Sequence, residues 1–121
     1  MNDRELLEFA AKAADMPKGA VMGSGDYLYE KGSVAIYWSP LNDDGDAMRL
    51  AVKLNIAIVP YPIYEQPKHS VIAKQYKDSR AIYRGEPTNS IEEIELYNDD
   101  PHSATRRAIV RAAAEIGKAM E

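Results

Sequence analysis

Three neighbouring aspartates form the densest carboxylate cluster in the sequence. Asp43, Asp44 and Asp46 could supply the oxygen ligands that Mg²⁺ and Ca²⁺ prefer. Their spacing does not match an EF-hand loop, which needs a glutamate at a fixed later position. The same residues stand where a helix is expected to begin, and aspartates cap the free N–H groups there. We therefore favour a capping role and keep a metal-dependent enzyme using these three residues as an alternative.

Four basic side chains near the C-terminus could bind phosphate: Arg106, Arg107, Arg111 and Lys118. They fall in a predicted helix, where successive residues are 100° apart, so Arg106 points away from the others. Glu115 offsets part of the charge. A solvated helix face is the simpler interpretation. Nucleic-acid binding through the best pair, Arg107 and Arg111, is an alternative.

Other reactive residue types are few. The chain has no cysteine, which excludes disulfides, zinc–thiolate sites and thiol nucleophiles. The two histidines, His69 and His102, lack the neighbours that would indicate a metal site or a catalytic triad. Gly23-Ser24-Gly25 has no lysine and so does not match a phosphate-binding loop. We expect no cofactor and favour a non-enzymatic protein.

Tyrosine is the most frequent aromatic residue, with eight copies against one phenylalanine. Its apolar ring and polar tip suit half-buried sheet faces and binding surfaces alike. Tyr27, Tyr29 and Tyr37 belong to a predicted hairpin, where lining the core is the simpler interpretation. Tyr61 and Tyr64 flank prolines near a predicted sheet edge, and we consider them candidates for binding a partner.

Composition indicates a soluble globular protein. The 121 residues fit a single domain, residues 1–121, with a net charge of −4 that does not favour nucleic acid. Apolar runs such as Ile56 to Val59 are far shorter than the roughly 20 residues of a membrane helix. The N-terminus has no signal-peptide pattern. We expect a cytoplasmic protein without membrane contact.

Hydrophobic periodicity predicts the elements that position these residues. We expect a first helix from Asp3, its cap, to about Ala14. A second helix is expected to begin after Asp43, with Asp46 completing a capping box, and to stop at Asn55. The segment from Met16 to Asp26 is predicted as a loop. The predicted strands are Tyr27–Glu30, Ser33–Trp38, Ile56–Tyr61, Val71–Tyr76 and Arg80–Gly85.

Two more segments complete the prediction. Ser90 to Tyr97 fits both a helix cap and strand alternation, and we prefer a strand. The clearest element is an amphipathic helix from Pro101 to Met120, capped by Asp100. Its predicted apolar face comprises Thr105, Ile109, Ala112, Ala113, Ile116 and Met120.

Consecutive strands indicate an antiparallel sheet. The predicted fold is therefore α+β: a three-layer α/β/α sandwich with a mostly antiparallel sheet of three to five strands and three flanking helices. Pro60 and Pro62 place the Ile56–Tyr61 strand at a sheet edge.

Two segments also resemble a known family. One segment runs from Trp38-Ser39-Pro40 to Leu54, and the other runs from Asp100 to Gly117. Both are similar to a phage α-β-α sandwich domain found in small, uncharacterised phage and prophage proteins. The resemblance covers about a third of the chain. It implies a three-layer sandwich and a bacterial host cytoplasm, and it supplies no activity. We expect an accessory protein that binds another protein or a second copy of itself, in part because an open edge near Pro60 could pair with another chain.

Overall fold

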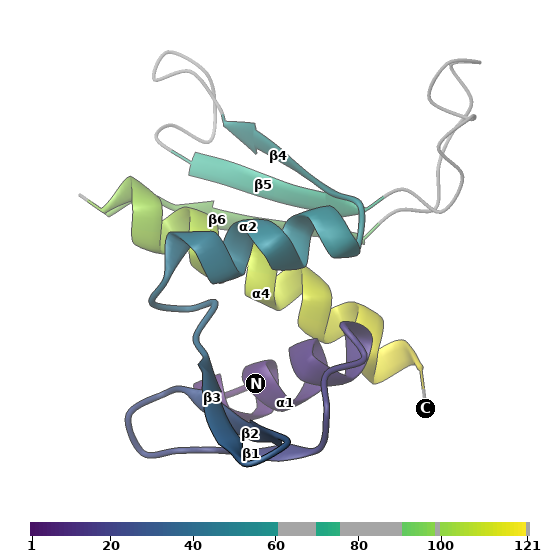
Figure 1. Cartoon of the computed structure of the whole chain (residues 1–121). Coiled ribbons are helices and arrows are strands. Elements are labelled where there is room, and N and C mark those ends of the chain that lie inside the picture. The colour runs from purple at the N-terminus through teal and green to yellow at the C-terminus, as the bar shows by residue number, and fades with distance from the viewer. Residues whose placement is uncertain (61–69, 76–90, 99, 121) are drawn as a thin grey trace.

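The computed structural model describes residues 1–60, 70–75, 91–98 and 100–120 (Figure 1). The predicted strand Arg80–Gly85 and the candidates His69, Tyr61 and Tyr64 lie outside these ranges. The elements are α1 (Asp3–Ala13), β1 (Gly19–Val21), β2 (Tyr27–Lys31), β3 (Val34–Trp38), α2 (Asp44–Lys53), β4 (Ile56–Pro60), β5 (Ser70–Gln75), β6 (Ile91–Leu96) and α4 (Pro101–Ala119).

The described strands form two antiparallel sheets of three strands each, in the orders β1-β2-β3 and β4-β5-β6. The predicted α+β class is confirmed, and the described residues include three helices, as predicted. Helix α4 lies against β5 and β6 on one side and against α1 on another, while α2 packs beside it. The molecule is layered. The sheet β4-β5-β6 lies over α2 and α4, and α1 and the sheet β1-β2-β3 lie below them (Figure 1).

Helix α1 is capped one residue earlier than predicted. The side chain of Asn2, not Asp3, accepts the hydrogen bond from the Glu5 N–H, at 2.9 Å. Asparagine and aspartate are comparable caps, so neighbouring candidates are hard to separate by sequence. The helix ends at Ala13, and Asp15 follows with a φ of 54°. The chain thus leaves the helix before Pro17.

The loop predicted from Met16 to Asp26 was wrong for its middle, because Gly19–Val21 forms strand β1 beside β2. Gly19 lies opposite Tyr29, and a Cβ at Gly19 would overlap the carbonyl of Leu28. Here glycine permits a close approach between strands rather than marking a loop. The glycines of this segment favoured a loop prediction, although three of its residues form a strand.

The hairpin and the segment before α4 formed as predicted. Strands β2 and β3 pair from Tyr27↔Trp38 to Lys31↔Val34, and Gly32 in the turn has a φ of 66°. The Ser90–Tyr97 segment contains strand β6, which confirms the preference for a strand.

The hairpin tyrosines divide between the core and the surface. Tyr27 is buried, donates from its hydroxyl to the Pro17 carbonyl at 2.7 Å and meets Trp38 edge to face. Tyr37 is exposed on the opposite face of the hairpin, where it pairs with Leu28.

Helix α4 begins as predicted: Asp100 caps it, accepting from the Ser103 N–H at 3.0 Å, and Pro101 occupies its first turn. A single apolar face was predicted, but the helix is buried on more than one side because α1, α2 and the second sheet all contact it. Residues outside the predicted face are also buried: Ala104, Ala108, Val110, Ala114 and Gly117. Small side chains make this possible because they let neighbouring backbones come close.

Candidate functional site

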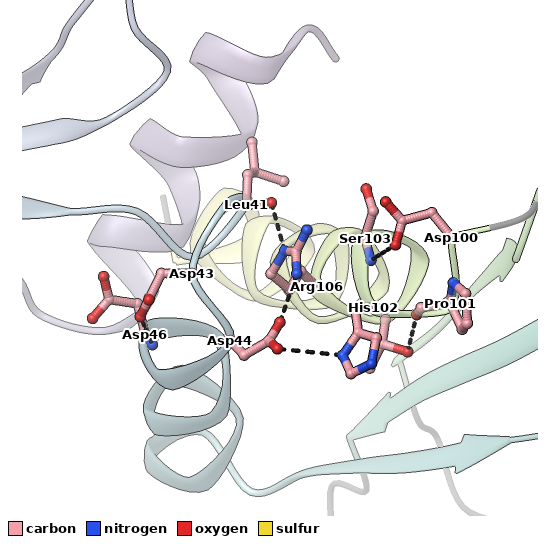
Figure 2. A network of polar contacts seen from close by, with 10 residues as sticks. Leu41, Asp43, Asp44, Asp46, Asp100, Pro101, His102, Ser103 and Arg106 are labelled. Carbon is pink, nitrogen blue, oxygen red and sulfur yellow. Dashed lines mark hydrogen bonds and ion pairs between the residues drawn. The ribbon is translucent and has the colours of Figure 1, made fainter.

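The three aspartates do not converge on one point (Figure 2). Asp43 caps α2 by accepting from the Asp46 N–H at 2.8 Å. The Asp46 carboxylate accepts from the Ser39 N–H at 2.9 Å and from Arg49 at 2.7 Å, so the predicted capping-box contact back to Asp43 is not made. Asn55, the predicted stop, has a φ of 56° just after α2. Within the described part of the chain, no group of three acidic or histidine side chains could hold a metal ion.

Asp44 joins α2 to α4. Its carboxylate accepts from Arg106 Nη1 at 2.6 Å and lies 3.3 Å from His102 Nδ1. Arg106 also donates to the Leu41 carbonyl at 2.9 Å, and its side chain is only 17% exposed. The hydrogen bond from Arg106 lowers the pKa of Asp44, although desolvation opposes the shift. This Asp44–Arg106–His102 cluster anchors the start of α2 to the first turns of α4.

Arg107 and Arg111 lie together, but acidic side chains surround them. Arg107 pairs with Asp3 at 2.9 Å, and Arg111 pairs with Glu93 at 2.8 Å and Glu95 at 2.9 Å. Desolvation raises the pKa of Glu93, while Arg111 opposes that shift. A phosphate would have to compete with these carboxylates.

An apolar cavity of about 420 Å³ lies beside the Asp44–Arg106–His102 cluster. It opens between α2, α4 and β4, and its apolar walls include Met48, Ile58 and Ile109. Met48 is 51% exposed, and Val52, one helical turn further along α2, is 69% exposed. Residues four apart share a helix face, so Asp44, Met48 and Val52 form one stripe.

Strand β4 is an edge strand, as its prolines predicted: within the described residues it pairs with β5 alone. Its sequence, Ile-Ala-Ile-Val-Pro, contains no charged residue, although charged residues commonly protect exposed edges. Met48 and Ile58 line the cavity on the helix-facing side of this edge, and Val52 lies one helical turn from Met48, while Val59 points to the opposite face of the sheet. We call these four residues the β4 edge surface.

Sequence reasoning missed two parts of this site. Met48 and Val52 fall outside the buried stripe of α2, which contains Ala47, Leu50 and Ala51. Their spacing of four residues was the available signal. Arg106 was correctly separated from Arg107 and Arg111 by its helix angle, but its partner 62 residues away was not foreseeable from that angle.

Comparisons with known proteins identify no relative. No family model, no curated protein and no solved structure matches the chain. Among the described helices, none is long and apolar enough to cross a membrane. The fold and the site thus define a small α+β protein in which β4, among the described residues, is an uncharged edge strand.

Proposed function

We propose that this chain is a non-enzymatic phage or prophage accessory protein that acts by binding another protein chain at the β4 edge surface. The observation that carries the proposal is the position of an uncharged edge strand beside exposed Met48 and Val52 and an apolar cavity. Extended edges recruit a further strand through backbone hydrogen bonds, and adjacent apolar pockets add specificity. The phage setting rests on the resemblance of two sequence segments.

The alternative functions receive less support from the geometry. The carboxylates of Asp44 and Asp46 each accept from an arginine, and that of Asp43 caps α2, so each already has a partner. Arg107 and Arg111 face glutamates of β6. Metal-dependent catalysis and nucleic-acid binding would both require these internal contacts to be replaced.

Site-specific photo-crosslinking tests the proposal. A photoreactive amino acid replaces Met48 in one variant and Val34 in the control; Val34 is also apolar, exposed and on an edge strand. Both variants are irradiated in purified form and in bacterial cytosol. We expect a discrete protein adduct from position 48 and not from position 34, and loss of that adduct when Val59→Lys is added. No adduct at position 48, or the same adducts at both positions, would overturn the proposal.

A further inference from the structure

We propose that a row of five alternating charges makes the attachment of β6 to α4 sensitive to pH, with a proton bound at Glu93 strengthening it. In order along the row, the members are Asp3, Arg107, Glu95, Arg111 and Glu93. Successive side chains lie 2.9, 3.6, 2.9 and 2.8 Å apart, and they come from α1, α4 and β6. Strands β4 and β6 lie on opposite sides of β5, so this response does not depend on what binds at the β4 edge surface.

Arg111 holds β6 to α4 through three contacts. Its guanidinium pairs with Glu93 and Glu95, and it also donates to the Ile94 carbonyl at 3.1 Å. Residues two apart in a strand point to the same face, so both glutamates face α4. Glu95 has a second arginine, Arg107, at 3.6 Å. Within the described residues, Glu93 therefore depends on a guanidinium that it shares with a better-paired neighbour.

The cavity beside Glu93 contains more negative than positive charge. It has a volume of about 240 Å³. Three glutamates and two arginines line it: Glu93, Glu95, Glu115, Arg107 and Arg111. Met1 also lines it, so its α-amino group is a third cation, while Asp3 on Arg107 is a fourth carboxylate. Among the described residues, four carboxylates thus face three cations, and one bound proton balances them.

The surroundings of Glu93 favour this carboxylate as the place where the proton binds. Its side chain is 17% exposed, whereas that of Asp3 at the other end of the row is 59% exposed. Desolvation raises the pKa of Glu93; Arg111 opposes this shift, and the negative charges of Glu115 and Glu95 add to it. The neighbouring strand β5 supplies no charge at this point, because Glu93 lies opposite Ala73.

Protonation changes how Arg111 is shared. When Glu93 is ionised, one guanidinium serves two carboxylates, and the partly buried charge is repelled by Glu115. When Glu93 is protonated, Arg111 is left to Glu95 and the Ile94 carbonyl, and that repulsion disappears. A carboxyl with a raised folded-state pKa stabilises the fold below its unfolded pKa and loses this effect as the pH rises through the folded value. Strand β6 should therefore open more readily at neutral than at acidic pH.

Native-state hydrogen exchange of the full chain measures such opening strand by strand. The observable is the protection of the β6 amides that bond to β5, corrected for the intrinsic pH dependence of exchange. We expect it to fall by about threefold or more between about pH 4 and pH 7, since Glu93 ionises over this range in the folded state. Amides of the β2–β3 hairpin belong to the other sheet and serve as the internal reference.

Three glutamine variants assign the response to its residue. Glu93→Gln mimics the protonated carboxyl, so its β6 amides should keep their acid-level protection at pH 7. Glu115→Gln should reduce the pH effect without removing it, because one source of repulsion is lost. Glu92→Gln is the matched control: Glu92 is the adjacent glutamate of β6, but it pairs with Lys74 on the other face of the sheet. This control should retain the wild-type pH dependence.

Two exchange results would overturn the proposal: protection of β6 that does not change with pH in the wild type, or wild-type pH dependence in Glu93→Gln. Loss of the dependence in Glu92→Gln as well would also contradict it, because the response would then not belong to the face that packs on α4. If Glu93→Gln misfolds, carbon-13 NMR of the wild type replaces it. We expect the Glu93 carboxyl to titrate above its ordinary value of 4.5, and titration at or below that value would refute proton binding there.

Discussion

Asp44 and Arg106 are 62 residues apart in the sequence, yet their side chains meet at 2.6 Å and join the start of α2 to α4 (Figure 2). Asp44 was considered for metal binding and Arg106 for phosphate binding, and both side chains are used in this internal contact. The cluster also forms one wall of the cavity beneath β4, since Asp44, His102 and Arg106 all line it. Its integrity therefore maintains the shape of the β4 edge surface.

Arg106→Ala should destabilise the protein more than Arg107→Ala. Arg106 is the less exposed of the two, and its removal deprives both the Leu41 carbonyl and the Asp44 carboxylate of a hydrogen bond. We expect a loss of about 1–3 kcal/mol for Arg106→Ala. For the more exposed Arg107, a loss below about 1 kcal/mol is expected. Urea unfolding measures both, and equal losses would contradict the anchoring role of Arg106.

The lowered pKa of Asp44 predicts a loss of stability in acid. A carboxyl whose pKa is lower in the folded state contributes stability above its unfolded pKa, near 3.8, and loses it as the pH falls through the folded value. Asp44→Asn removes this contribution. The variant should be less stable than the wild type at pH 6, and the difference should shrink below about pH 4. Thermal unfolding across this range is the measurement; a difference that does not change with pH would count against the assignment.

The raised pKa of Glu93 predicts the opposite dependence. A carboxyl whose pKa is higher in the folded state contributes stability below its unfolded pKa, near 4.5, and loses it as the pH rises through the folded value. Glu93→Gln should therefore gain stability relative to the wild type between pH 4 and pH 7. Urea unfolding at several pH values tests this, with Glu8→Gln on the exposed face of α1 as the control. A relative loss over this range would refute the role of burial at Glu93.

Gly117 allows α1 and α4 to touch. A Cβ at this position would overlap the backbone carbonyl of Phe9, so Gly117→Ala should cost about 1–3 kcal/mol despite the better helix propensity of alanine. Gly45→Ala in α2 is the matched control, because the new methyl would meet only side-chain atoms, those of Arg49 and Asp43, and at longer distances of 3.1–3.2 Å. Calorimetry should show a lower melting temperature for the first variant and little change for the second. Similar melting temperatures would mean that the two helices can separate without cost.

Local signals in the sequence identified most of the described elements. Asp100 with Pro101 marked the start of α4, and Asp43 marked the start of α2. Both are capping interactions between residues three apart, so no tertiary information is needed to find them. The error at Asn2 and Asp3 has the same origin, because adjacent capping residues compete locally. Strand β1 was missed because three residues carry too little periodicity to outweigh their glycines.

The candidate site was less predictable because its parts come from distant segments. Helix angles grouped Arg107 with Arg111 correctly, but nothing in the sequence showed that β6 would place Glu93 and Glu95 against them. The prolines indicated that β4 lies at an edge. They could not show that exposed Met48 lies beside it over a cavity, because that depends on how α2 packs on α4.

The sequence by itself therefore determined the α+β class, the capped starts of α2 and α4, and the edge position of β4. These properties follow from contacts within a few residues and from the missing N–H of proline. Only the tertiary structure decided the partners of Asp44 and the arginines, the burial of α4 on several sides, and the position of exposed Met48 beside the edge strand β4. Those relationships depend on long-range packing, which brings side chains remote in the sequence into contact and into charge pairs.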